Sequence, residues 1–138
     1  MAAIIETAER FFEACETGQG WAECQRYCHP DATFSAQSAA LEGVDSLDGY
    51  TEWMKGLLTP LADGRAEVRS FAVDEKRSKV TVYAVFHGTH TGEGGPVPPT
   101  GKSAAADYVY DLTFHGDMIR HLTKIWNDGA TMQQLGWA

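Results

Sequence analysis

The period of the hydrophobic pattern changes once along this chain, close to residue 65. Before that point, apolar side chains recur at the three- and four-residue spacing of amphipathic helices. The spacing predicts helices over about 3–17, 21–28 and 47–61, with a short strand over 32–37. After that point apolar and polar residues alternate, as in strands with one buried face. The alternation predicts strands over 66–75, 79–91, 106–114 and 119–126, followed by a short turn or helix.

Helices first and hairpin-linked strands later are typical of an α+β fold, with helices on one face of a curved antiparallel sheet. The 138 residues are enough for a single domain, 1–138, with one core. Helices laid across the concave side of such a sheet form a cone around an apolar cavity. Cavities of this kind commonly bind small molecules, so we expect a small apolar ligand.

Charge and cysteine content narrow the function classes. A net charge of −8 disfavours nucleic acid and anionic membranes, because both need a basic surface. No apolar run reaches about 18 residues, and the first residues lack the basic segment of a signal peptide. Three cysteines without a secretion signal predict reduced thiols and a cytoplasmic protein. Cys24, Cys28 and His29 lack a second ligand pair at zinc spacing, so we expect no metal.

Strand parity separates the candidate acid and base residues of 106–114. Tyr108 and Tyr110 alternate with Asp107 and Asp111, and the tyrosine face is the more apolar one. We therefore expect the tyrosines to point toward the helices and both aspartates to lie outside. Over 119–126 the two faces are almost equally apolar, so parity alone leaves the direction of this strand open.

Three motifs carry a family resemblance that spans nearly the whole chain. They are "WAECQRYCHPDATF", "GTHTGEGGPVPPTGK" and "HGDMIRHLTKIWNDGATMQQLGW". Together they resemble the SnoaL-like polyketide cyclases of the nuclear-transport-factor-like superfamily. The resemblance implies the α+β cone, a homodimer formed through the sheet face, and acid/base chemistry in the cavity without a cofactor. Ring closure by aldol addition, isomerisation, dehydration and epoxide hydrolysis all occur among such enzymes.

The resemblance also implies where the chemistry lies, and there this chain departs from its relatives. The carboxylate base of the steroid isomerase relatives falls on Ala36. The aspartate of the cyclases falls on Lys124, and their histidine falls near Tyr110. This register also places Lys124 inside the cone and leaves Ile119, His121 and Ile125 on the outer face. A slip of one residue would reverse both positions, and would bring Asp107, Asp111 and His121 inside.

Tyr110, Lys124 and His90 are the predicted catalytic residues. A buried lysine has a lowered pKa, and its charge would lower the pKa of a facing tyrosine. Either group could then move a proton or polarise a carbonyl. The competing interpretation is a core tyrosine, a lysine at the rim of the cavity and a structural histidine. If the three are catalytic, Tyr110→Phe and Lys124→Ala should abolish turnover and leave the fold intact.

The predicted ligand-binding residues are mostly apolar or aromatic and are expected to line the cavity. They are Tyr27, Phe34, Trp53, Met54, Leu58, Phe86, Tyr108, Leu122, Trp126 and Asn127. The leading hypothesis is an acid/base enzyme for a small apolar carbonyl compound, such as a polyketide or terpenoid. The alternatives are a carrier or sensor that binds such a compound without chemistry, and an assembly domain that binds a partner through its sheet.

Overall fold

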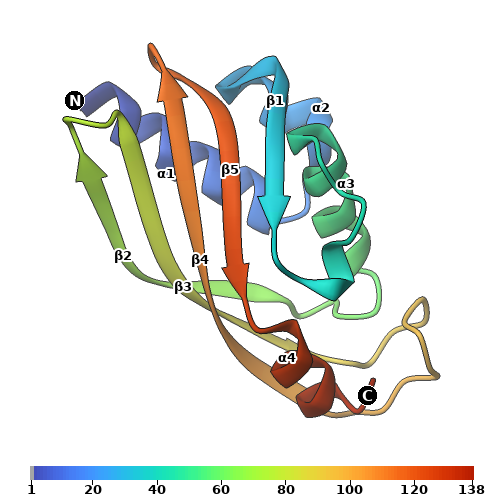
Figure 1. The fold of residues 1–138 in the computed structure, drawn as a ribbon. Coiled ribbons are helices and arrows are strands. Elements are labelled where there is room, and N and C mark those ends of the chain that lie inside the picture. The colour runs from blue at the N-terminus through green and yellow to red at the C-terminus, as the bar shows by residue number, and fades with distance from the viewer. Residues whose placement is uncertain (1) are drawn as a thin grey trace.

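The computed structural model describes residues 2–138 and has the predicted order of helices and strands (Figure 1). Its helices are α1 (Ala2–Glu16), α2 (Gly20–Cys24), α3 (Leu47–Leu57) and α4 (Asp128–Leu135), with short 3₁₀ turns at Gln25–Tyr27 and Ala39–Leu41. Its strands are β1 (Cys28–Ala36), β2 (Arg65–Asp74), β3 (Lys79–Thr89), β4 (Ser103–His115) and β5 (Met118–Trp126). The change of hydrophobic period near residue 65 thus marks the start of the four consecutive strands.

The five strands form one curved sheet in the order β1-β5-β4-β3-β2. The strands from β2 to β5 pair antiparallel, as expected, but β1 pairs parallel to β5, so the sheet is mixed. In Figure 1, α1, α2 and α3 cover one face of this sheet, and α4 lies near the end where β5 leaves it. The α+β cone expected from the sequence is therefore present.

The segment around Pro30 differs from the prediction. The second helix ends at Cys24 rather than at residue 28, and β1 begins at Cys28, four residues earlier than expected. Pro30 lies within β1, where it has no amide hydrogen to donate. This loss is tolerated because β1 is an edge strand, with no neighbour on one side.

An irregularity between β4 and β5 changes which side chains point inward. Thr113 pairs with His121, but the next residue, Phe114, pairs with Ile119. The extra residue on β5 turns Ile119 into the core, where it is fully buried. The expectation that Ile119 lies on the outer face was therefore wrong. On the other side of this bulge, Lys124 faces the helices as the family register implied.

The local sequence explains where α3 begins and where α4 ends, and both helices contribute residues to the site. Ser46 caps α3 by accepting a hydrogen bond from the amide of Gly49 at 3.0 Å. Gly136 ends α4 in the left-handed conformation, which glycine adopts without strain. The following residue, Trp137, then donates its amide hydrogen back to the Met132 carbonyl, and its ring lies against His90. Within residues 2–138, no helix has the length and apolar character needed to cross a membrane.

Candidate functional site

A narrow and mostly apolar cavity of about 20 Å³ lies between the helices and the sheet. Its wall is built from α1, α3, β3, β4, β5, α4 and the residues just after α3 and α4. The lining residues are Glu16, Met54, Leu57, Leu61, Phe86, Ala106, Tyr108, Lys124, Trp126, Thr131, Met132, Leu135 and Trp137. Glu16 and Lys124 are the ionisable groups of opposite charge in this wall, so they define where acid/base chemistry could occur.

A chain of three hydrogen bonds connects these two groups. Lys124 Nζ donates to the Tyr50 hydroxyl at 3.0 Å, and the hydroxyls of Tyr50 and Tyr110 are 2.7 Å apart. Tyr110 in turn donates to Glu16 Oε2. Because the protonated amine can only donate and the carboxylate can only accept, both hydroxyl hydrogens point from Lys124 toward Glu16. The site is therefore a hydrogen-bonded relay with a defined direction.

Glu16 accepts a second hydrogen bond and is the last residue of α1. The Tyr108 hydroxyl donates to Glu16 Oε1 at 2.5 Å, so each carboxylate oxygen accepts from one tyrosine. The side chain is 4% exposed, and it is the last residue of a helix, where the backbone dipole disfavours an anion. Such a carboxylate is held in place by its two tyrosines rather than by solvent.

Glu16 and Tyr50 are not among the functional residues predicted from the sequence. Glu16 follows Phe12 by four residues and Ala8 by eight, so it lies on the apolar face of α1. A carboxylate on the apolar face of a predicted helix was the signal in the sequence that could have identified Glu16 as a site residue. Tyr50 lies on the apolar face of α3 in the same way, and only the fold shows that its hydroxyl meets Tyr110 and Lys124.

Four aromatic rings surround the amine of Lys124. Its Nζ lies 4.4 Å from the ring centre of Trp126, 5.1 Å from Tyr50, 5.2 Å from Trp53 and 5.3 Å from Tyr108. The faces of these rings attract a cation and also exclude water from it. Lys124 is 6% exposed and forms no ion pair with any carboxylate in the described chain.

Burial is the main cause of the pKa shifts at this site. It lowers the pKa of Lys124 to about 8, against the opposing effect of the negative charge on Glu16. It raises the pKa of Glu16, although Lys124 and the two tyrosines act in the opposite direction. Burial also raises the pKa of Tyr110, with contributions from Cys15 and Glu16. The lowered pKa of Lys124 is as expected, whereas the expectation that Lys124 lowers the pKa of Tyr110 was wrong.

The lowered pKa of Lys124 leads to a direct prediction. In a protein labelled with ¹³C at the lysine ε-carbons, one of the five signals should titrate with a midpoint near pH 8. The amine is charged below that pH and neutral above it, whereas an unperturbed lysine titrates near about 10.4. NMR spectra recorded between pH 6 and pH 11 would show this, and the early signal should be missing in Lys124→Met. Five coincident titrations near the unperturbed value would refute a desolvated amine.

His90 is buried but lies outside the cavity wall. Its Nδ1 accepts hydrogen bonds from the Trp137 indole at 2.9 Å and from the Thr100 amide at 3.3 Å. Its Nε2 is buried without a hydrogen-bond partner in the described part of the chain. Trp137 stands between His90 and the cavity, since Trp137 lines it and His90 does not. The structure thus brings Tyr110 and Lys124 together, whereas Trp137 separates His90 from the cavity.

The predicted ligand-binding residues divide into two groups. Four of them line the cavity: Met54, Phe86, Tyr108 and Trp126. Trp53 lies against Trp126 and is one of the four aromatic side chains that surround the Lys124 amine. The others lie elsewhere. Phe34 and Leu122 are buried in the core, and Leu58 packs beside Gly18 and Gly64. Tyr27 faces a surface hollow between α1 and α2, and Asn127 caps α4.

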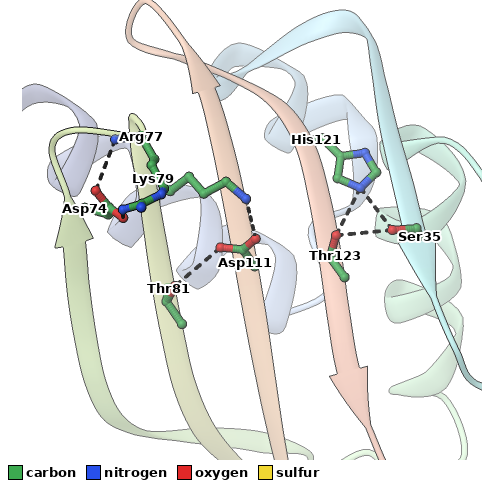
Figure 2. Close-up of polar contacts among 8 residues, drawn as sticks. All are labelled: Ser35, Asp74, Arg77, Lys79, Thr81, Asp111, His121 and Thr123. Atoms are coloured by element: carbon green, nitrogen blue, oxygen red, sulfur yellow. Dashed lines mark hydrogen bonds and ion pairs between the residues drawn. The ribbon is translucent and has the colours of Figure 1, made fainter.

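Of the alternative acid and base residues, Asp111 and His121 lie on the outer face of the sheet in Figure 2. Asp111 accepts from Lys79 at 2.9 Å, and His121 contacts Ser35 at 3.0 Å and Thr123 at 3.1 Å. Asp107 accepts from the hydroxyl of Tyr83, which is itself exposed. The register of β4 and β5 pairs Tyr110 with Lys124 and thereby separates these residues from the cavity.

Comparison with known proteins agrees with this fold. The chain is 25% identical to aklanonic acid methyl ester cyclase AcmA from Streptomyces galilaeus, over 99% of this chain and 92% of the relative. A structure described as a candidate SnoaL-like polyketide cyclase from Jannaschia sp. CCS1 superposes with a TM-score of 0.81 at 17% identity, covering 99% of this chain and 94% of that one. IdmH, a candidate polyketide cyclase from Streptomyces antibioticus, superposes with a TM-score of 0.78 at 21% identity, covering 95% and 96%.

The sequence profile that describes SnoaL-like polyketide cyclases matches residues 6–135. This range includes both ends of the relay, Glu16 on α1 and Lys124 on β5, as well as α4 to its last residue. Because the match extends over nearly the whole chain, this protein belongs to the SnoaL-like polyketide cyclase family.

Proposed function

We propose that this protein is a cyclase-type acid/base enzyme that closes a ring in a small, mostly apolar carbonyl compound of the polyketide kind. The family supports a cofactor-independent cyclase role in general terms. The observation that carries the specific proposal is the relay from Lys124 through Tyr50 and Tyr110 to Glu16, with both ends in the cavity wall.

The two ends of the relay suit the two halves of an aldol ring closure. Glu16, as a carboxylate of raised pKa, is a base that removes a proton from the carbon next to a carbonyl. Lys124, as a buried cation, stabilises the negative charge that then develops on the carbonyl oxygen. The enolate carbon attacks a second carbonyl of the same molecule, and the new alkoxide takes up the proton from Glu16. Tyr108 and Tyr110 hold the carboxylate in place throughout.

To test this activity, the protein is incubated in D₂O with aklanonic acid methyl ester, the compound that appears in the name of the relative AcmA, and with a panel of simpler β-keto esters. Ring closure leaves the mass unchanged except for deuterium taken up at the acidic carbon, so chromatography and mass spectrometry detect both events. Loss of exchange in Glu16→Gln, with unchanged exchange in Glu9→Gln on the exposed face of α1, would support the assignment. Equal exchange in wild type and Glu16→Gln would refute it.

The alternative is a carrier that binds the same kind of compound without changing it. The two departures from the acid/base patterns of relatives, Ala36 and Lys124, favour this alternative. Ala36 pairs with Lys124 across β1 and β5, so both departures lie at one place in the sheet. Binding of the ester without deuterium uptake would select the carrier over the enzyme.

We also propose that two copies associate through the outer face of the sheet, which leaves aliphatic side chains exposed. Ile125 is 61% exposed and pairs with Val109, which in turn pairs with Tyr83, itself 38% exposed on the same face. Replacing Ile125 with Lys should convert a dimer to a monomer, because a charge at the centre of a buried contact must be desolvated. Light scattering during gel filtration measures this. A monomeric wild type would contradict the proposal.

A further inference from the structure

We propose that Lys124 acts as a covalent catalyst, whose amine condenses with a ketone or aldehyde carbonyl of the substrate to form an imine within the cavity. This inference rests on the proposed function, because it gives the same lysine a bond to the substrate in place of a charge contact. It concerns a single position, Lys124, where the resemblance to the cyclases implies an aspartate.

The first support is the position of the amine. Lys124 is the one lysine that contributes to the described cavity wall, and its Nζ is enclosed by the rings of Trp126, Trp53, Tyr50 and Tyr108. It is bound by one neutral hydroxyl rather than by a carboxylate, so no ion pair has to be broken before it attacks. Apolar surroundings are the condition under which a lysine becomes a nucleophile near neutral pH. The pKa of about 8 agrees with this geometry.

The second support is the direction of the relay. When an amine attacks a carbonyl, its nitrogen becomes positively charged and has to lose a proton. The hydrogen bonds from Lys124 to Tyr50, on to Tyr110, and on to Glu16 already point away from the nitrogen. A proton handed along this chain ends on a carboxylate whose pKa is raised by burial, so it is both accepted and available for return.

The nitrogen lone pair forms the N–C bond, and the π electrons of the carbonyl move to its oxygen. One proton passes from nitrogen through Tyr50 and Tyr110 to Glu16, which returns it to that oxygen. A second proton comes from solvent, and the oxygen leaves as water. The iminium then loses a proton from the neighbouring carbon to Glu16, the enamine carbon attacks the second carbonyl, and the new alkoxide takes this proton back from Glu16. Water finally hydrolyses the iminium to the product ketone and the neutral amine and releases the solvent proton, so no oxidant or reductant is needed.

The experiment uses the full chain with cyclohexanone as the probe and sodium cyanoborohydride to reduce any imine to a stable secondary amine. Peptide mass spectrometry then measures the labelling of each lysine over time. Lys124 should be labelled about tenfold or more faster than the exposed Lys102, because its pKa of about 8 leaves the Lys124 amine neutral in a larger fraction of molecules near pH 7.5 than an ordinary lysine amine. Labelling spread over the exposed lysines with Lys124 unmodified would overturn the inference.

Two variants test the role of the relay. Tyr110→Phe should slow labelling of Lys124 about tenfold or more, because it removes the hydroxyl that links Tyr50 to Glu16. Tyr83→Phe, which removes an exposed hydroxyl on the outer face, should leave the labelling rate unchanged. Equal rates in wild type and Tyr110→Phe would overturn the proton path.

The same probe separates this inference from the proposed function. Without reductant, deuterium uptake beside the carbonyl of cyclohexanone reports acid/base chemistry. Uptake that depends on Glu16 but occurs without labelling of Lys124 would refute the imine and leave the proposed function standing. Labelling of Lys124 without any uptake would establish the covalent site and refute the proposed function.

Discussion

Lys124→Met should reduce ring-closing turnover by about 10³-fold and leave the protein folded. The variant removes the positive charge that stabilises the developing oxyanion, and groups of this kind are worth about 10²–10³ in rate. It also removes the nucleophile, if the imine forms. Methionine is unbranched and polarisable, and it fits against the four rings that surround the lysine stem. Steady-state rates and thermal unfolding of the same preparations measure the two effects.

The matched control is Lys79→Met on the outer face of the sheet. Lys79 pairs with Asp111 at 2.9 Å, and both side chains are partly exposed, so the pair contributes at most about 1 kcal/mol. Its loss should leave turnover unchanged. If both variants lose activity equally, the effect comes from the sheet as a whole and not from the amine in the cavity.

Tyr110→Phe should reduce turnover by about 10²–10⁴-fold, the usual range for loss of a positioned proton-transfer group. The ring remains, so packing against Phe12 and Tyr50 is retained. The hydroxyl is lost, and with it one donor to Glu16 and the acceptor for Tyr50. Stability should fall by about 1–3 kcal/mol, since a buried carboxylate loses a partner. Rate measurements and denaturant unfolding test the two parts separately.

Tyr83→Phe serves as the control for this variant, because the Tyr83 hydroxyl donates to Asp107 in an exposed hydrogen bond on the outer face of the sheet. It should change neither rate nor stability by a measurable amount. A Tyr110→Phe protein with full activity would show that the relay is a structural network, as in the interpretation of Tyr110 as a core tyrosine.

The alternation of apolar residues predicted the inner face of β4 correctly because that strand is regular up to Thr113. Tyr108 and Tyr110 accordingly point inward, and Asp107 and Asp111 lie on the other side. The same reasoning failed at Ile119, because a bulge adds one residue and parity cannot be carried across it. Lys124 was placed inside by the family register and not by parity.

The relay itself could not be predicted from the sequence, because its four residues come from four separate elements. Glu16 belongs to α1, Tyr50 to α3, Tyr110 to β4 and Lys124 to β5. Periodicity identifies which face of each element is buried, but it does not specify how the elements are placed against one another. Hydrogen bonds of 2.7 Å and 3.0 Å depend on that placement.

The contact between Trp137 and His90 has a mechanical consequence for the cone. Trp137 follows α4, and His90 begins the Gly/Pro segment that leads to β4. The Trp137–His90 hydrogen bond, their edge-to-face ring contact at 5.2 Å and a hydrogen bond from Thr100 to the Leu135 carbonyl at 2.7 Å fasten these two segments together. Trp137 and α4 also supply part of the cavity wall. A substrate too large for the present space would therefore have to push both segments outward as one unit.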